Sequence, residues 1–247
     1  KEIDAESIDL IYCDILYGTG RNFGDYQDLK PDLNIIKEHY IPRLKEMHRV
    51  LKPDGSIYLQ MDNKINHWIR CILDEIFGYS NFRNQIIACI KSGNKSNKQF
   101  SNRYDVVTLY SASDEYTYNI DAVAKENPEA KRFKHKDENG LYRWNRENVK
   151  DYKRYLKPVN QNDVWLDVGQ VQGNSKENCN YKTQKPKALL ERIIKASSNE
   201  GDTVADFYMG SGTTAEVSLE LNRKFIGCDI GEKAFDITKE RLEKISI

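Results

Sequence analysis

The architecture of this chain follows from one segment, Val204-Ala-Asp-Phe-Tyr-Met-Gly-Ser-Gly-Thr-Thr214. A short apolar run ends at Asp206, a turn with Gly210 and Gly212 follows, and Thr213 opens a helical pattern. Glycine is needed where the backbone takes a positive φ angle or approaches a ligand closely. The segment therefore predicts a strand, a tight turn and a helix start. A glycine turn with a purely structural role fits these residues as well.

Two further strand ends carry acidic residues. The apolar run 225–228 ends at Asp229, where a doubly wound nucleotide-binding fold holds ribose hydroxyls. The apolar run 8–13 ends at Asp14. Because ligands of open α/β sheets bind at the carboxyl ends of the strands, we expect Asp14 and the glycine turn to line one crevice, although about 190 residues separate them.

Strand-like and helix-like segments alternate along the chain. We expect strands at 8–13, 56–61, 83–90, 105–111, 204–206 and 225–230, and helices at 34–51, 64–77, 186–197, from 213, and at 232–245. A turn is predicted at 52–55, and Gly78 fits a helix C-terminus. Residues 112–165 show no sustained period and are interpreted as an insertion. This order predicts an α/β fold with a doubly wound, mostly parallel sheet covered on both faces.

Composition narrows the class of protein. The 247 residues are 39% hydrophobic, which suits one domain with a sizeable core. The formal net charge is zero, so a nucleic-acid surface must be a local patch. Five cysteines without CxxC spacing indicate reduced thiols in a cytosol, and the four histidines have no ligand spacing, so no metal is expected. No apolar run approaches membrane-spanning length.

The segment Asp14-Ile-Leu-Tyr17 has residues suited to an unstacked base. The carboxylate of Asp14 can accept a hydrogen bond from an exocyclic amine, and the ring of Tyr17 can stack on the base. An ordinary strand end with an acidic cap and a core tyrosine remains the alternative.

Taken together, these segments resemble the amino-methylating DNA methyltransferases of the β arrangement, in which the catalytic motif precedes the cofactor motif. The resemblance spans nearly the whole chain. It is carried, in order, by Asp14-Ile-Leu-Tyr17, Leu51-Lys-Pro-Asp-Gly55, Thr183-Gln-Lys-Pro186, Gly210-Ser-Gly-Thr-Thr214 and Arg223-Lys-Phe-Ile-Gly-Cys-Asp229. The resemblance implies a Rossmann-like methyltransferase sheet with circularly permuted motif order in a single domain, 1–247.

The resemblance implies S-adenosylmethionine as the cofactor, without a metal. Residues 206–212 are expected to wrap its methionine part, and Asp229 to hold its ribose. Lys185 either pairs with the cofactor's carboxylate or is a solvated surface lysine. The cofactor-binding residues implied are Thr183, Lys185, Asp206, Tyr208, Gly210, Ser211, Gly212, Thr213 and Asp229.

The catalytic residues implied are Asp14, Ile15, Leu16 and Tyr17, which match the family's Asp-Pro-Pro-Tyr signature at its two ends. The implied chemistry is direct transfer, in which the amine donates to Asp14 and to the carbonyl of Ile15, so no cysteine nucleophile is needed. Ile15 and Leu16 replace two prolines, which removes fixed φ angles and adds two N–H groups that need partners. Strong and absent activity are both compatible with this change. The family's strand upstream of the first motif would lie before Lys1.

Asp14 favours adenine N6 over cytosine N4 as the acceptor, because the cytosine enzymes of the family often carry serine there. Target recognition in this arrangement lies between the catalytic and cofactor halves, here approximately 91–180. The candidates for contacts to double-stranded DNA are Lys91, Lys95, Lys98 and Arg103, with 131–136 as a second basic segment. A solvated loop between two strands is the alternative for these residues.

The leading interpretation is a site-specific DNA adenine-N6 methyltransferase of a restriction-modification system in the bacterial cytoplasm, associated with DNA. A cytosine-N4 or RNA amino-methyltransferase, a catalytically impaired DNA-binding or partner subunit, and a small-molecule methyltransferase are the alternatives. The motif order and the basic insertion count against the last, and the intact glycine turn counts against a loss of cofactor binding. A homodimer and a cognate restriction endonuclease are expected from the resemblance alone, and no membrane partner is expected.

Overall fold

The computed structural model describes residues 2–24, 26–90, 97–125, 130–147, 150–157 and 162–245. The chain divides into two compact units. Unit 1 comprises Lys1–Tyr118 and Asp163–Ile247, and unit 2 comprises Asn119–Asn162. Each is described by itself below.

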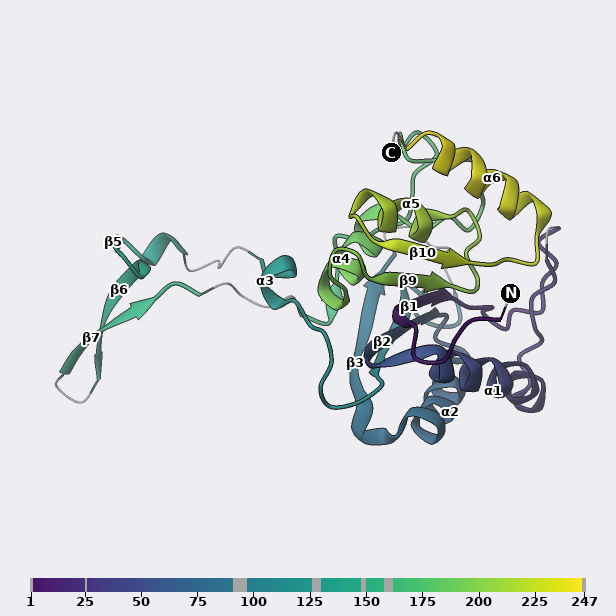
Figure 1. Ribbon diagram of the computed structural model, residues 1–247, viewed down its shortest axis with the longest axis horizontal. Coiled ribbons are helices and arrows are strands. Elements are labelled where there is room, and N and C mark those ends of the chain that lie inside the picture. The colour runs from purple at the N-terminus through teal and green to yellow at the C-terminus, as the bar shows by residue number, and fades with distance from the viewer. Residues whose placement is uncertain are drawn as a thin grey trace. The chain divides into compact units, whose positions relative to one another are not determined.

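Unit 1 is built on one seven-stranded sheet (Figure 1). Its strands, in spatial order, are β10 (Lys224–Gly227), β9 (Thr203–Asp206), β1 (Ile8–Asp14), β2 (Leu51–Met61), β4 (Tyr104–Ser111), β3 (Phe82–Cys89) and β8 (Val164–Trp165). β4 runs antiparallel to both of its neighbours, and the other pairs are parallel. The predicted α/β fold with a mostly parallel sheet is therefore confirmed.

Helices cover both faces of this sheet. The first core contains α1 (Leu33–Val50) and α2 (Asn66–Phe77), whose apolar side chains pack against β1 and β2. The second core contains α4 (Lys187–Ser197) and α5 (Thr213–Glu220), packed against β1, β4 and β9. α6 (Glu232–Glu243) contacts α5, and a short 3₁₀ turn, Tyr79–Asn81, precedes β3. A sheet buried on both faces explains the continuous apolar runs in the sequence.

Local signals set the helix ends close to their predicted positions. α1 begins after Asp32, whose carboxylate accepts from the backbone N–H groups of Asn34 and Ile35. Its buried residues include Ile36, Tyr40 and Leu44, spaced by four, so one face meets the sheet. Gly78 ends α2 with a φ angle of 86°, as predicted for a helix C-terminus.

The predicted turn at 52–55 lies inside β2 instead of before it. Ile8 pairs with Leu51, whereas Leu10 pairs with Ser56, so β2 bulges between these two pairs. A Cβ atom at Gly55 would stand 2.9 Å from the carbonyl oxygen of Asp9, which explains the glycine. Turn residues thus form a bulge here because β1 continues alongside them.

Unit 2 corrects the prediction of an irregular segment. It contains α3 (Ile120–Val123), a 3₁₀ turn at Ala130–Arg132, and an antiparallel sheet of β5 (His135–Asp137), β6 (Gly140–Glu147) and β7 (Lys150–Tyr155). The cross-strand pairs Tyr142–Tyr155 and Trp144–Lys153 mix aromatic and charged residues. Aromatic and polar residues alternate only over Tyr142-Arg-Trp-Asn145, and β7 is mostly charged, so the pattern is too short to predict strands.

The predicted inserted region, approximately 91–180, is not one structural body. β4 and β8 both lie within it and pair with β3 of the large sheet. The compact unit between them is Asn119–Asn162. Among the helices in the described ranges, none has both the length and the apolar character needed to cross a membrane.

Candidate active site

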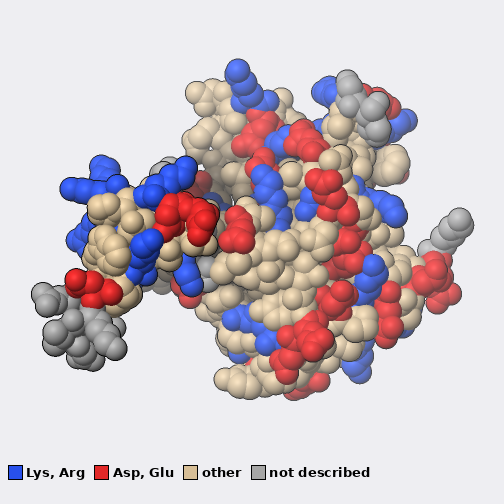
Figure 2. Space-filling model, turned by 60° about the vertical axis from the view of Figure 1, so that its left-hand side comes forward, with Lys and Arg blue, Asp and Glu red and all other residues tan. Residues whose placement is uncertain are grey.

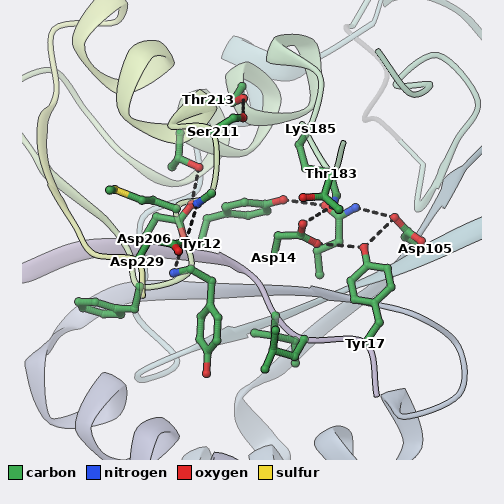
Figure 3. A pocket seen from close by; sticks show the side chains of 18 of the residues that line it. Tyr12, Asp14, Tyr17, Asp105, Thr183, Lys185, Asp206, Ser211, Thr213 and Asp229 are labelled. Atoms are coloured by element: carbon green, nitrogen blue, oxygen red, sulfur yellow. Dashed lines mark hydrogen bonds and ion pairs between the residues drawn. The ribbon is translucent and has the colours of Figure 1, made fainter. Parts of the chain in front are cut away.

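The sheet order brings the predicted motifs to one edge. β1 and β9 are parallel neighbours, with Leu10 paired to Val204 and Ile11 to Ala205. β10 pairs with β9 on the other side. The strand ends at Asp14, Asp206 and Asp229 therefore open onto the same cavity, which has a volume of about 1400 Å³ (Figure 3).

Most of the predicted site residues line this cavity. They are Asp14, Ile15, Leu16, Tyr17, Thr183, Lys185, Asp206, Tyr208, Gly210, Ser211, Thr213 and Asp229. Gly212 is not among the lining residues and forms the N-terminal cap position of α5. Within the described parts of the chain, no group of three or more His, Cys, Asp and Glu side chains is arranged to hold a metal ion.

The glycine turn has the backbone conformation that the sequence predicts. Gly210 has a φ angle of 49° and Gly212 one of 73°. A Cβ atom at Gly212 would lie 2.5 Å from the hydroxyl oxygen of Thr238 in α6. A Cβ atom at Gly210 would lie 3.4 Å from the ring of Tyr181, which also lines the cavity. The two glycines thus allow close packing on α6 and a bare backbone at the cavity wall.

Two aspartates accept hydrogen bonds from residues of the glycine turn and its flanks. Asp206 is buried and accepts from the Thr214 hydroxyl at 2.6 Å and from the backbone N–H of Tyr208 at 3.0 Å. Burial raises the pKa of Asp206 to about 7. Asp229 accepts from the backbone N–H groups of Gly210 at 2.9 Å and Gly231 at 2.8 Å. Asp229, the residue expected to bind the ribose, therefore also fixes the backbone of the turn.

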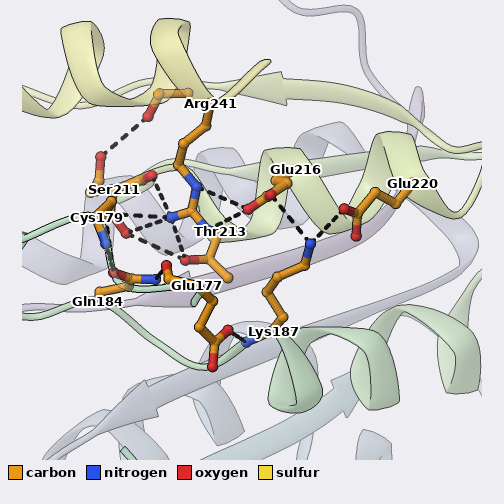
Figure 4. A network of polar contacts seen from close by, with 11 residues as sticks. Glu177, Cys179, Gln184, Lys187, Ser211, Thr213, Glu216, Glu220 and Arg241 are labelled. Atoms are coloured by element: carbon orange, nitrogen blue, oxygen red, sulfur yellow. Dashed lines mark hydrogen bonds and ion pairs between the residues drawn. The ribbon is translucent and has the colours of Figure 1, made fainter. Parts of the chain in front are cut away.

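A buried arginine that the sequence analysis did not single out ties the turn to α6 (Figure 4). The guanidinium of Arg241 is paired with Glu216 of α5. It also donates to the carbonyl oxygen of Ser211 at 2.9 Å and to the hydroxyl of Thr213 at 3.1 Å. Its contact with the sulfur of Cys179, at 3.7 Å, reaches the segment before Thr183-Gln-Lys-Pro186. Arg241 lies among charged residues of the last helix, Lys239, Glu240 and Glu243, so nothing in the sequence marks it as buried.

Lys185 forms an ion pair with Asp14, and less than a fifth of its side chain is exposed. The interpretation as a solvated surface lysine is therefore wrong. Burial raises the pKa of Asp14 above its ordinary value, and the ammonium group of Lys185 acts against this rise. In the protein without ligands, Lys185 thus neutralises the carboxylate that is expected to receive the base.

Tyr17 joins Asp14 to a second carboxylate, Asp105 of β4. The Tyr17 hydroxyl oxygen lies 2.9 Å from a carboxylate oxygen of each (Figure 3). Gln60 of β2 donates from its amide nitrogen to the same oxygen of Asp105 at 2.9 Å. Sequence reasoning missed Asp105, because only the pairing of β4 with β2 brings it to this edge.

Ile15 and Leu16 stand where the family has two prolines, and other contacts here restrain the backbone in place of the proline rings. The backbone N–H of Ile15 donates to the carbonyl oxygen of Gln60 at 3.0 Å, which continues the pairing of β1 with β2. The Ile15 side chain is buried. The Tyr40 hydroxyl donates to the carbonyl oxygen of Leu16 at 3.0 Å. These contacts hold the segment between Asp14 and Tyr17.

The predicted DNA contacts are only partly within the described structure. Lys98 and Arg103 are exposed in the segment before β4, and neither lines the cavity, although their neighbour Asn102 does. Lys91 and Lys95 lie outside the described residues. The second basic segment, 131–136, lies in unit 2.

Comparisons with known proteins agree with this geometry. A family model described as DNA methylase matches residues 8–240. The chain is 34% identical to Type II methyltransferase M.HpaI of Haemophilus parainfluenzae, covering 98% of this chain and 70% of that protein. It is 33% identical to DNA adenine methyltransferase YhdJ of Escherichia coli K12, covering 100% and 80%.

Solved structures share the fold at lower identity. The M1.HpyAVI–SAM complex aligns with a TM-score of 0.57 and 19% identity, covering 95% of this chain and 89% of that one. The PvuII DNA methyltransferase (cytosine-N4-specific) aligns with a TM-score of 0.68 and 16% identity, covering 99% and 82%.

Proposed function

This chain belongs to the DNA methylase family, and from that membership we propose that it transfers a methyl group from S-adenosylmethionine to the N6 amine of adenine in double-stranded DNA. The observation that carries the proposal is that Asp14 and Tyr17, at the end of β1, share one cavity with the glycine turn at the end of β9. Adenine is favoured because YhdJ, at 33% identity, is named a DNA adenine methyltransferase.

The cavity residues fit S-adenosylmethionine. Gly210 offers bare backbone at the wall, at a positive φ angle that other residues rarely adopt. Asp229 offers a carboxylate for ribose hydroxyls, and Lys185 offers an ammonium group for the amino-acid carboxylate. When bound, S-adenosylmethionine supplies an electrophilic methyl group on a positively charged sulfur.

The residues of the chain orient the amine. In our proposal, the target amine of a flipped adenine donates to the carboxylate of Asp14 and to the carbonyl oxygen of Ile15, and Tyr17 stacks on the base. Held in this way, the nitrogen directs its lone pair at the methyl carbon, and Asp14 stabilises the positive charge that develops. No side-chain nucleophile is needed.

Lys185 must release Asp14 before the amine can take its place. A bound cofactor carboxylate gives the ammonium group another partner within the same cavity. Cofactor binding would then prepare Asp14 for the base.

Unit 2 is proposed as the main DNA-contacting part of the region 91–180, and Lys98 and Arg103 as further phosphate contacts. Between residues 119 and 162 the sequence has 11 Lys and Arg against 7 Asp and Glu. Figure 2 shows Lys and Arg side chains over much of this unit, with fewer acidic ones. Trp144 is 53% exposed beside Lys153, a combination suited to bases and phosphates.

Family membership also leads us to propose three properties that rest on it alone. They are a homodimer, a cognate restriction endonuclease with the same recognition sequence, and a location in the bacterial cytoplasm at the DNA. Light scattering of the purified protein with and without DNA tests the first.

Product analysis tests the proposed reaction. The purified protein is incubated with tritium-labelled S-adenosylmethionine and unmethylated genomic DNA, and the DNA is digested to nucleosides. We expect the label in N6-methyladenine. Label in N4-methylcytosine would overturn the choice of base. No label, with cofactor binding intact by calorimetry, would make the chain a catalytically impaired subunit.

A further inference from the structure

The Tyr17 hydroxyl has a single proton and lies within hydrogen-bond distance of two carboxylates. Its oxygen lies 2.9 Å from Oδ1 of Asp14 and 2.9 Å from Oδ2 of Asp105 (Figure 3). A phenol carries one proton, so it can fully donate to only one carboxylate at a time. The second contact becomes a full hydrogen bond only when one carboxyl group is protonated. Asp14, Tyr17 and Asp105 can therefore bind one additional proton between them.

Asp105 is fixed as the far end of this cluster. Oδ2 of Asp105 also accepts from the amide nitrogen of Gln60 at 2.9 Å. The Tyr12 hydroxyl donates to the other end of that amide, Oε1 of Gln60, at 2.7 Å, and both residues are buried. Because the carboxylate of Asp105 can only accept, the NH₂ group of Gln60 faces Asp105 and its oxygen faces Tyr12. Two donors thus hold one carboxylate oxygen of Asp105 against Tyr17.

The proposed reaction delivers one proton to this place. The nitrogen lone pair forms the new N–C bond while the S–C bond breaks and its electron pair stays on sulfur. The nitrogen then carries one proton too many, and the N–H bond must break with its electrons returning to nitrogen. Asp14 is the carboxylate at which the amine is held, so it is the first acceptor.

We propose that Asp105 takes up this proton through Tyr17. The proton moves from nitrogen to Asp14, from Asp14 to the phenol oxygen, and the original phenol proton moves to Oδ2 of Asp105. The net result is a neutral methylated amine, a restored Asp14 carboxylate, an unchanged phenol and a protonated Asp105. Asp105 acts through Tyr17 and is therefore a positioning residue. This inference rests on the proposed function.

The surroundings support the first step, from nitrogen to Asp14, and the exit of the proton from Asp105. Asp14 lies among charged and titratable groups from the neighbouring elements: Tyr12 of β1, Tyr17, Tyr26, Asp105 of β4, Lys185 and Asp206 of β9. Burial, with a contribution from the charge of Asp105, raises the pKa of Asp14, so Asp14 accepts a proton more readily than an exposed aspartate. Asp105 is partly exposed and lines the cavity beside the exposed Asn102, where water can remove the proton.

The first test compares single-turnover rates. Asp105→Asn keeps an acceptor oxygen but removes the carboxylate, and Tyr17→Phe removes the hydroxyl but keeps the ring. We expect each to lower the rate by about 100-fold, the lower end for general acid–base catalysis. Because both act in one path, the double variant should be no slower than the slower single variant. Asp114→Asn, past the other end of β4 with its carboxylate paired to Arg83, is the matched control and should keep the wild-type rate.

The outcomes distinguish a failure of the proposed methyl transfer from a failure of the proposed role of Asp105. A wild-type protein that methylates no base overturns the proposed function. An active wild type with an Asp105→Asn variant of equal rate overturns the role of Asp105. Rate losses that multiply in the double variant also overturn it, because they would place the two residues in independent roles.

The second test needs neither cofactor nor DNA. Tyrosine labelled with ¹³C at Cζ is incorporated, and the Tyr17 signal is assigned by its loss in Tyr17→Phe. In wild type we expect the signal to move as pH falls and the additional proton binds. In Asp105→Asn the step should shift to lower pH, because the negative charge that raises the pKa of Asp14 is gone. A signal without a step, or with the same step in both proteins, would contradict the shared proton.

Discussion

Asp14 is the residue on which the proposed chemistry depends most directly. Replacing it by alanine should lower methyl transfer by at least about 1000-fold, because the amine loses both its orienting partner and the charge that stabilises it. Cofactor affinity should not fall, since the replacement leaves the glycine turn and Asp229 intact and frees Lys185 for the cofactor carboxylate. Turnover and calorimetric titration with S-adenosylmethionine measure the two effects. Retained turnover would remove Asp14 from the mechanism.

Asp206 gives the protein a pH-dependent stability. With a pKa raised to about 7, the folded chain keeps a proton on Asp206 that the unfolded chain releases near its ordinary value. The stabilisation is complete below that ordinary value and is lost as pH rises through 7. The free energy of unfolding should therefore fall between about pH 4 and pH 7, by at most about 4 kcal/mol.

Urea unfolding of Asp206→Asn tests this dependence. The amide stays neutral, so the variant should lack this part of the pH dependence and gain stability relative to wild type at about pH 8. The measurement is made without cofactor, because a ligand that binds the folded state would add its own stabilisation. Parallel pH curves for the two proteins would refute a raised pKa for Asp206.

At the scale of elements, α6 acts as a clamp on the turn between β9 and α5. Replacing Arg241 by alanine removes its contacts with Ser211, Thr213 and Glu216. We expect the dissociation constant for S-adenosylhomocysteine, the demethylated form of the cofactor, to rise about tenfold, which corresponds to the loss of about one hydrogen bond to a charged group. DNA affinity should not change. Calorimetry and DNA titration measure the two constants.

Lys239→Ala is the matched control for this clamp, since Lys239 is an exposed cation of the same helix. It should leave both constants unchanged. Added guanidinium ion should partly restore cofactor affinity to Arg241→Ala, which a general loss of stability would not allow. Equal cofactor affinity in Arg241→Ala and wild type would reduce α6 to a packing element.

The sequence predicts the elements best where one physical signal dominates. The glycine turn needs positive φ angles at Gly210 and Gly212, and only glycine satisfies them without cost, so this prediction was confirmed. The bulge at 52–55 could not be predicted, because it depends on which strand runs beside β2. Arg241 and Asp105 could not be predicted either, because their partners come from elements that are distant in the sequence.

At the scale of the whole molecule, unit 2 should carry much of the DNA affinity. A variant with alanine at Lys134, Lys136 and Arg154, which are exposed in unit 2, should bind DNA more weakly. If each contacts one phosphate, the slope of log affinity against log salt should become flatter by about 2.7. Cofactor affinity should be unchanged.

The matched control removes three exposed cations of unit 1, at Lys37, Lys45 and Lys239. Its salt dependence should stay close to that of wild type. Fluorescence anisotropy with a labelled duplex at several salt concentrations measures both slopes. Equal slopes for the two variants would show that the charge of unit 2 has no special part in DNA binding.

The pairing of β1 with β9 also determines when the site comes into existence. Leu10 and Val204 are hydrogen-bonded neighbours, yet nearly the whole chain lies between them. During synthesis, β1, α1, β2 and α2 are complete well before Thr203 leaves the ribosome, and domains begin to fold as they emerge. Closing so long a loop is a late step. A nascent or truncated chain therefore has Asp14 without its partner strand, and methylation activity appears only once translation has reached Asp229.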